Sequence, residues 1–372
     1  MGVDDSNYNI SEKEEDKLTI SNLLSELIAR GGSDLHITTG SYPMFRIDGD
    51  LLAATNYQRM TAELTKKLAY SVLNDQQKKH FEIEHELDLS FGIPKLSRFR
   101  GNVFMQRGAV AMAIRVIPYE IRTFKELGLP QVIDDLCKTP KGLVLVTGPT
   151  GSGKSTTLAT MIDKLNGDRR SHIVTVEDPI EYLYRHKKCI VNQRQVGSDT
   201  KSFNNALKYV LRQDPDIVLI GEMRDLETID AALTIAETGH LTFATLHTNS
   251  AAEAIVRIVD AHPANRQSQV RAQLAFVLVA VVTQSLIPKI RGGRVLAVEI
   301  MTATPAIKAL IRDDKIHQIY SLIQAGRKFG MQTLNQSLYD LYTTRQISLE
   351  NALSFSRNVE ELEHMISDHS RA

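Results

Sequence analysis

The ten residues from position 148 to 157, GPTGSGKSTT, restrict the fold of this chain more than any other stretch. They match the pattern G-x-x-x-x-G-K-[ST], they follow the apolar run LVLVT at 143–147, and a helical pattern begins near Ser155. A strand, a glycine-rich loop and a helix in this order form a cradle whose backbone N–H groups surround phosphate oxygens. Lys154 can reach the β- and γ-phosphates of a nucleotide, and the Ser155 hydroxyl can ligate Mg²⁺.

We therefore expect ATP and Mg²⁺ to bind at this loop. The alternative is a glycine-rich turn with an exposed lysine, which does not account for the apolar strand before the motif and the helix after it. The residues expected to contact the nucleotide are Thr150, Gly151, Ser152, Gly153, Lys154, Ser155 and Thr156.

The stretch from Leu143 onward alternates apolar runs with helical patterns. Near-continuous apolar strands separated by helices are typical of a parallel sheet that is covered on both faces. We therefore predict an α/β fold for this part of the chain. The expected strands span 143–147, 172–176, 216–220, 241–245 and 294–300.

The ends of these strands are polar. The run HIVTV leads into EDPIE at 177–181, DIVLI leads into Gly221-Glu222, and LTFAT leads into Leu246-His247-Thr248. Ligands of open α/β sheets bind just outside the carboxyl ends of the strands. We therefore expect a phosphate loop, carboxylates and a histidine to meet at one edge.

Each of these polar residues has a functional and a structural interpretation. Glu222 is the candidate to hold Mg²⁺, and Glu181 and Asp178 are candidates to position the attacking water. The alternatives are a solvated carboxylate at a strand end for Glu222 and turn or cap chemistry around the proline for the other two. His240 and His247 each fit either a nucleotide contact or an ordinary hydrogen bond.

Nucleotide hydrolysis often needs a positive charge that reaches the γ-phosphate from outside the loop. Arginines of the segment before the linker could supply it, or could form a solvated face of the small domain. Their use on ATP would imply an interface between domains or subunits above the nucleotide. The candidates are Arg98, Arg100, Arg107 and Arg115.

The chain has 44 Lys and Arg and 44 Asp and Glu, so it has no overall positive charge of the kind that attracts nucleic acid. Cys137 and Cys189 form no CxxC pair, which argues against a disulfide framework and a structural zinc site and favours the cytoplasm. The most apolar segment, 274–282, is far shorter than the roughly 20 residues of a membrane span, and we interpret it as a buried helix. Direct membrane insertion is therefore not expected.

The start of the chain is polar and acidic, unlike a signal peptide. The letters MGVDDS fit the bare myristoylation pattern, but a polar disordered leader is the simpler interpretation. We predict a leader over 1–17, a small α+β domain over 18–117, a linker with a short helix over 118–142, an ATPase core over 143–303, and a helical region with a tail over 304–372.

Four segments in order, GPTGSGKSTT, VTVEDPIEY, LRQDPDIVLIGEMRD and AETGHLTFATLHTNSA, resemble the Walker A, Asp, Walker B and His boxes of the secretion ATPase superfamily. SDLHITTG and RFRGNVF resemble that superfamily's N-terminal domain. Within it, the chain is most similar to the ATPases that retract type IV pili. It has a short N-terminal region and no tetracysteine motif, and AIKALIRD at 306–313 resembles their AIRNLIRE signature with changes at Lys308, Ala309 and Asp313.

The resemblance implies a PAS-like N-terminal domain, a RecA-like P-loop core and a homohexamer with ATP between subunits. It implies that Glu181 is the catalytic glutamate, Glu222 the Walker B glutamate and His247 the histidine of the His box. By position, Arg100 and Arg115 match the interfacial arginines.

The same resemblance implies a Mg²⁺-dependent ATPase motor that couples hydrolysis to domain rotation and powers pilus retraction and twitching motility. It would work at the cytoplasmic face of the inner membrane, at the pilus base. Its implied partners are an inner-membrane pilus platform protein (PilC-like) and a paralogous accessory ATPase.

Three alternatives differ in function. A pilus assembly or type II secretion ATPase is disfavoured by the missing metal motif and by the segment 306–313. A RecA-like nucleic-acid motor is disfavoured by the balanced charge, so no nucleic-acid partner is expected. A nucleotide-binding scaffold without turnover is disfavoured by the presence of Lys154, Glu181 and Glu222. The sequence fits a main and an accessory retraction motor equally.

Overall fold

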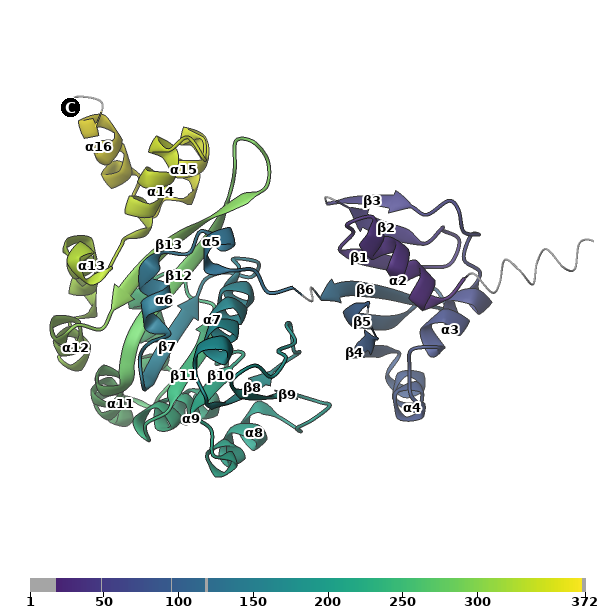
Figure 1. The fold of residues 1–372 in the computed structure, drawn as a ribbon, viewed down its shortest axis with the longest axis horizontal. Helices are drawn as coiled ribbons and strands as arrows, with labels where there is room; N and C mark the ends of the chain where they lie inside the picture. Colours follow the sequence, from purple (N-terminus) through teal and green to yellow (C-terminus); the bar gives the residue numbers. More distant parts are fainter. Residues whose placement is uncertain (1–17, 48, 95, 118–119, 370–372) are drawn as a thin grey trace, which may run out of the picture. The chain divides into compact units, whose positions relative to one another are not determined.

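The computed structural model describes residues 18–47, 49–94, 96–117 and 120–369, so the expectations for the leader 1–17 lie outside the described residues. The chain divides into two compact units, Met1–Glu120 and Ile121–Ala372 (Figure 1).

Unit 1 contains a six-stranded antiparallel sheet with the strand order β3-β2-β1-β6-β5-β4. Its core is formed by apolar residues of the strands and of the three helices within the described residues, among them Leu23, Phe81 and Phe99. The elements are α2 (Ile20–Ala29), β1 (Asp34–Ile37), β2 (Met44–Ile47), β3 (Asp50–Ala53), α3 (Ala62–Tyr70), α4 (Asp75–Glu84), β4 (Glu86–Ile93), β5 (Ser97–Gln106) and β6 (Ala109–Ile117).

Two separate helices, α3 and α4, follow one another over residues 62–84. The break is explained by Asn74, whose side chain accepts a hydrogen bond from the backbone N–H of Gln77, while the Gln77 side chain accepts one from the Asn74 backbone. This capping box begins a new helix instead of continuing the old one.

Unit 2 is built on a seven-stranded sheet with the order β13-β12-β7-β11-β10-β8-β9, in which only the β12–β13 pair is antiparallel. The α/β fold with a mainly parallel sheet is confirmed. The strands are β7 (Gly142–Thr147), β8 (His172–Glu177), β9 (Ile190–Gln195), β10 (Ile217–Ile220), β11 (Leu241–Leu246), β12 (Leu278–Pro288) and β13 (Arg294–Thr302).

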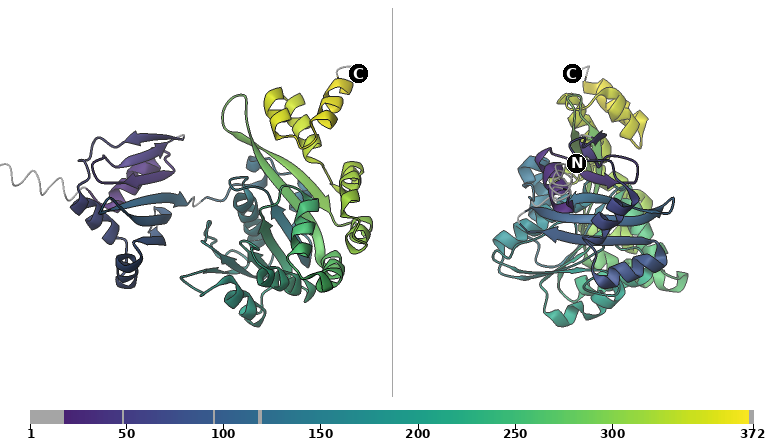
Figure 2. Two further views of the ribbon diagram at one scale, coloured as in Figure 1. Left: turned by 180° about the vertical axis from the view of Figure 1, so that it is seen from behind. Right: turned by 90° about the vertical axis from the view of Figure 1, so that its right-hand side faces the viewer.

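Helices cover both faces of this sheet, as Figure 1 and the view from behind in Figure 2 show. One apolar cluster joins the sheet to α8–α13, and another joins the opposite face to α6 and α7. The helices are α5 (Phe124–Leu127), α6 (Gln131–Leu136), α7 (Lys154–Asp168), α8 (Phe203–Val210), α9 (Leu226–Glu237), α10 (Ala251–Asp260), α11 (Ala264–Val277), α12 (Pro305–Arg312), α13 (Ile319–Ala325), α14 (Leu334–Thr343), α15 (Leu349–Phe355) and α16 (Val359–His369).

Two parts of unit 2 differ from the sequence interpretation. Residues 121–142 belong to unit 2, because Ile133 and Leu136 of α6 pack into the cluster under α7. The segment 274–282 is not one helix, since α11 ends at Val277 and β12 begins at Leu278. A short apolar run fits a buried helix and a buried strand equally well, so its periodicity could not separate the two.

The last three helices form a cluster of their own. Leu338 of α14, Ala352 of α15 and Leu362 of α16 pack against Ile287 and Ala297 of the β12–β13 hairpin. This places the C-terminal helices beside the edge strand β13, at the yellow end of the chain (Figure 1).

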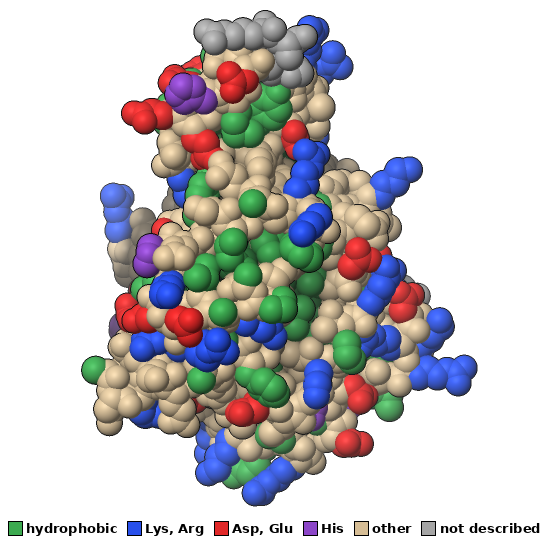
Figure 3. Space-filling model, turned by 90° about the vertical axis from the view of Figure 1, so that its left-hand side faces the viewer, with side chains coloured by type: hydrophobic (Ala, Val, Ile, Leu, Met, Phe, Trp, Pro, Cys, Tyr) green, Lys and Arg blue, Asp and Glu red, His purple; other side chains and the backbone are tan. Residues whose placement is uncertain are grey.

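The surface carries charges of both signs. Figure 3 shows one face of the molecule, where acidic and basic side chains lie around a central group of hydrophobic ones. In the part of the chain that the structure describes, no helix is both long and apolar enough to cross a membrane.

Candidate active site

The phosphate loop lies between β7 and α7, as its sequence predicts. Gly148 has a φ of 137°, and a Cβ atom there would overlap the backbone oxygen of Gln284, so no other residue fits. Gly153 precedes α7 with a φ of 91°, in the left-handed region. The backbone N–H groups at the start of α7 therefore face the mouth of the loop without a side-chain cap.

Lys154, the first residue of α7, is 9% exposed. Its Nζ atom donates hydrogen bonds to the carbonyl oxygens of Gly148 at 2.7 Å and Pro149 at 3.0 Å. Burial lowers the pKa of Lys154, while the charges of Glu222 and Glu181 act in the opposite direction. A phosphate group placed in the loop would supply the counter-charge that neutral carbonyl oxygens do not provide.

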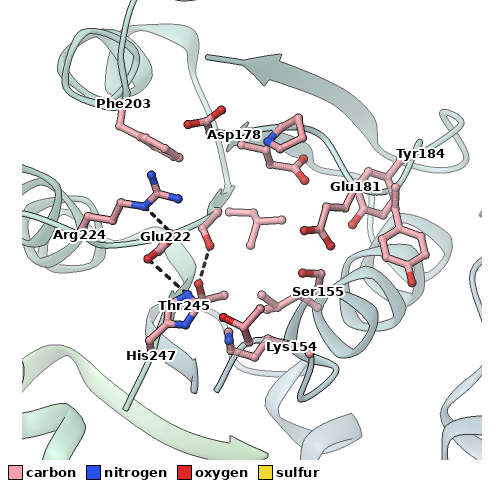
Figure 4. A pocket seen from close by; sticks show the side chains of 18 residues that line it. Lys154, Ser155, Asp178, Glu181, Tyr184, Phe203, Glu222, Arg224, Thr245 and His247 are labelled. Atoms are coloured by element: carbon pink, nitrogen blue, oxygen red, sulfur yellow. Dashed lines mark hydrogen bonds and ion pairs between the residues drawn. The ribbon is translucent and has the colours of Figure 1, made fainter. Parts of the chain in front are cut away.

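Four strand ends meet at one pocket, as the parallel order of β7, β11, β10 and β8 requires. Lys154 and Ser155 line it from the loop after β7, Glu181 from the segment after β8, Glu222 from the end of β10, and His247 from the end of β11. Figure 4 shows these side chains around a common space, with the Glu181 carboxylate directed into it above Ser155. The structure therefore brings together the candidates from the loop and from three neighbouring strands.

Glu222 is the centre of a polar group in this pocket. Its Oε2 atom accepts a hydrogen bond from Nε of Arg224 at 2.8 Å, and its Oε1 atom lies 3.4 Å from Nε2 of His247 (Figure 4). The hydrogen bond to Glu222 raises the pKa of Arg224. Glu222 thus links the ends of β10 and β11, and its carboxylate holds the Arg224 side chain in the pocket.

Glu177, the last residue of β8, is the buried carboxyl group of the pocket, with 8% of the residue exposed. Its Oε1 atom accepts hydrogen bonds from Thr175 Oγ1 at 2.6 Å and from Gln193 Nε2 at 3.3 Å. Burial raises its pKa, and these hydrogen bonds act against the rise. Asp178, the next residue, is exposed and also lines the pocket.

Several pocket residues were not predicted. Arg224 follows Glu222 by two positions, and Tyr182 adjoins Glu181, so closeness to a predicted residue was the available signal. The Tyr182 hydroxyl lies 3.0 Å from Oγ1 of Thr156, an interaction between the loop helix and the Asp box. Phe203 begins α8 and reaches the pocket only through the fold.

His240 does not lie in this pocket. It precedes β11 and therefore sits at the amino end of that strand, whereas His247 follows the carboxyl end. Its Nδ1 atom lies 3.0 Å from the carbonyl oxygen of Ile235. This contact fits the structural interpretation of His240 as an ordinary hydrogen-bonding residue.

The two predicted interfacial arginines belong to unit 1. Arg100 on β5 and Arg115 on β6 face each other as a register pair of neighbouring strands. The Nε atom of Arg115 donates to Oδ1 of the buried Asp34 at 2.7 Å. Their contact with a nucleotide stays a prediction.

The pocket offers few side-chain ligands for a divalent cation. Among the described residues there is no group of three or more His, Cys, Asp or Glu side chains that could hold a metal ion on its own. Ser155 and Glu222 offer oxygen atoms on opposite sides of the pocket. Mg²⁺ prefers oxygen ligands and is commonly held by one or two side chains together with substrate phosphates.

Comparison with known proteins finds relatives of one family over most of the chain. The model of the family "Type II/IV secretion system protein" matches residues 11–292. The chain is 51% identical over 335 residues to the type IV pilus retraction ATPase PilT of Pseudomonas aeruginosa, covering 90% of this chain and 97% of that one. It is 45% identical over 337 residues to the twitching motility protein of Neisseria gonorrhoeae, covering 89% and 90%.

A solved structure has the same fold. The crystal structure of the pilus retraction motor PilT with bound ADP matches with a TM-score of 0.89 and 52% identity, covering 94% of this chain and all of that one.

Proposed function

This chain belongs to the type II/IV secretion system protein family, and we propose that within it the chain is an ATP-driven motor that retracts type IV pili. The observation that carries the proposal is the pocket in which Lys154, Glu181 and Glu222 meet from separate strands. The likeness to a pilus retraction ATPase over nearly the whole of both chains supports retraction as the work performed.

In the proposed reaction, the N–H groups of residues 150–156 and the ammonium of Lys154 bind the phosphates of ATP. Ser155 and Glu222 hold Mg²⁺, which would offset the charge of the phosphates when bound. Glu181, exposed at the pocket wall, orients the attacking water and accepts its proton. His247 lies beside Glu222 and fixes the orientation of that carboxylate.

The proposed working form is a homohexamer in which ATP lies between subunits and Arg100 and Arg115 of one subunit approach the nucleotide of the next. Binding and hydrolysis would alternate two arrangements of the units and so produce domain rotation. The motor would act at the cytoplasmic face of the inner membrane through a pilus platform protein, with a paralogous accessory ATPase as a further partner.

Cells that lack the gene provide the test. They are complemented with the wild type, with Glu181→Gln, or with Glu227→Gln, a matched change of an exposed glutamate on α9 away from the pocket. We expect abundant, immobile pili without the gene, and motility restored by the wild type and by Glu227→Gln only. Absent pili would point to assembly instead, and unchanged pili and motility would contradict a retraction role.

A further inference from the structure

Glu299 is a buried carboxylate outside the pocket, on the edge strand β13. The residue is 2% exposed, and each of its carboxylate oxygens has a different partner. Oε1 accepts a hydrogen bond from the backbone N–H of Ala251 at 2.8 Å, and Oε2 accepts one from Arg357 at 3.2 Å. Burial raises the pKa of Glu299, and the charge of Arg357 acts against the rise. A buried ion pair calls for an explanation, because its desolvation costs free energy and apolar side chains in its place often stabilise a fold.

The sheet register places Glu299 level with the pocket. Glu299 pairs with Thr283 of β12, and Thr283 pairs with Thr147, the last residue of β7 before the phosphate loop. The hydroxyl oxygens of Thr147 and Thr283 lie 2.8 Å apart. Thr147 also pairs with Leu246, the last residue of β11 before His247. Glu299 therefore lies in the same row of paired residues as Thr147 and Leu246. The phosphate loop and the His247 loop leave the sheet directly after these two residues.

The partner of Oε1 directly follows the loop that carries His247. Ala251 is the first residue of α10, and residues 247–250 connect it to β11. Within this connection, the backbone N–H of Asn249 donates to Oε2 of Glu253 at 2.9 Å. The end of the loop is thus held by its own helix α10 and, through Glu299 and the N–H of Ala251, by β13.

The partner of Oε2 belongs to the C-terminal helices. Arg357 lies between α15 and α16, and its side chain is 34% exposed. Arg357 also lines a hollow together with Asn249 and with Pro149 of the phosphate loop. One carboxylate therefore joins the loop of His247 to the helical segment that ends the described chain.

We propose that Glu299 is a positioning residue for ATP hydrolysis, which holds the amino end of α10 and thereby the His247 loop, and that Arg357 couples this anchor to the C-terminal helices. The inference rests on the proposed ATPase function for its catalytic consequence. A shift of α15 and α16 would change the pairing of Glu299 and so the placement of His247 beside Glu222. The phosphate loop itself is not attached to Glu299, so nucleotide binding should be spared.

Two changes at Glu299 separate its two contacts. Glu299→Gln keeps an acceptor for the Ala251 N–H and loses the ion pair, whereas Glu299→Leu loses both. We expect Glu299→Leu to lower kcat of the full chain by about tenfold or more, with KM and the affinity for a fluorescent ATP analogue changed by less than about twofold. Glu299→Gln should lower kcat only about threefold, because it keeps the contact with the Ala251 N–H. Equal losses in both variants, or a parallel loss of affinity, would overturn the proposal.

Arg357 tests the coupling in a variant that leaves the core intact. Arg357→Ala should lower kcat at least about threefold in the wild-type background and cause no further loss in the Glu299→Gln background, because the ion pair is already absent there. Arg327→Ala, at an exposed arginine of the same C-terminal region, is the control and should change nothing. Equal effects of Arg357→Ala in both backgrounds would overturn the coupling.

Amide hydrogen exchange tests, independently of ATPase activity, whether Glu299 holds the His247 loop. In Arg357→Ala and Glu299→Leu, amides of residues 247–252 should exchange at least about threefold faster than in the wild type, while amides of 148–157 are unchanged. A wild-type chain without ATPase activity would contradict the proposed function, and the exchange result would still decide whether Glu299 holds the loop. Unchanged exchange over 247–252 would overturn the anchor, and so would faster exchange over both segments.

Discussion

The Nε2 atom of His247 lies 3.4 Å from Oε1 of Glu222, and the two residues extend from the ends of neighbouring strands. The pair lies where β10 and β11 open towards the phosphate loop, and Arg224 occupies the other oxygen of the same carboxylate. The geometry suggests that the histidine and the glutamate act as one unit.

A double-mutant cycle tests this unit. We expect Glu222→Gln and His247→Ala each to lower the ATPase kcat by about tenfold or more, and the double mutant to be no slower than the slower single mutant. The control cycle replaces Glu222→Gln with Glu227→Gln, which should add nothing to His247→Ala. A double mutant whose loss equals the product of the single losses would show that the residues act independently.

Glu181→Gln should separate binding from chemistry. The amide keeps the size of the side chain and removes its capacity to accept a proton, so kcat should fall by about 100-fold or more. Affinity for ATP, measured by fluorescence of a labelled nucleotide, should stay near that of the wild type. Unchanged turnover in Glu181→Gln would remove the assignment of this residue as the base.

Lys154→Met should abolish nucleotide binding without unfolding the chain. The change removes two hydrogen bonds to loop carbonyls, but it also removes the cost of a buried ammonium. The wild type should gain about 2.7 kcal/mol of stability at an ADP concentration 100 times its Kd, and the variant should gain nothing. Thermal melting with and without ADP measures this. Lys164→Met, a control on the same helix, should keep the gain, and its loss there would mean that the assay reports helix damage.

Most of the pocket could be predicted from the sequence because parallel strands share one functional edge. The apolar runs that form β7, β8, β10 and β11 have clear boundaries in the sequence. The residues directly after each run could therefore be assigned to the carboxyl edge of the sheet. The same rule, applied strictly, separates His247 from His240, since the latter precedes β11. The direction of β11 alone is enough to place His247, and not His240, at the carboxyl edge of the sheet.

The remaining parts depended on pairings that a single sequence does not encode locally. The strand β12 was hidden in a run that also suits a helix, and without β12 the register of β13 cannot be predicted. The position of Glu299 follows from that register, and so does its contact with Ala251. Arg357 and Phe203 reach their partners through packing between distant segments, which has no periodic signal.

The phosphate loop should be intolerant of a side chain at its first glycine. A Cβ atom at Gly148 would overlap the oxygen of Gln284 and lie 2.7 Å from Oγ of Ser152, whereas one at Gly151 would meet nothing within 4 Å. Both glycines have positive φ, 137° at Gly148 and 78° at Gly151, so a side chain strains the backbone at either position and overlaps neighbouring atoms only at the first. We expect Gly148→Ala to cost about 1–3 kcal/mol more than Gly151→Ala in urea unfolding. Equal costs would show that the loop relaxes freely.

The pH dependence of stability should reveal the buried Glu177. Burial raises the pKa of its carboxyl above the ordinary 4.5, so the folded chain binds this proton more tightly than the unfolded chain. Its contribution to stability is therefore complete below about pH 4.5 and is lost as the pH rises through the folded pKa. Gln in its place does not titrate. The Tm of Glu177→Gln, relative to the wild type, should rise as the pH is raised from about 4.5 to 8.

Glu126 provides a comparison of opposite sign for this measurement. Hydrogen bonds from the backbone and hydroxyl of Thr123 lower its pKa, so its contribution to stability is present above about pH 4.5 and is lost on acidification. The Tm of Glu126→Gln, relative to the wild type, should therefore fall as the pH is raised towards about 4.5 and stay nearly level from there to pH 8. Parallel curves for the two variants would mean that the overall charge of the chain, and not the burial of Glu177, governs the difference.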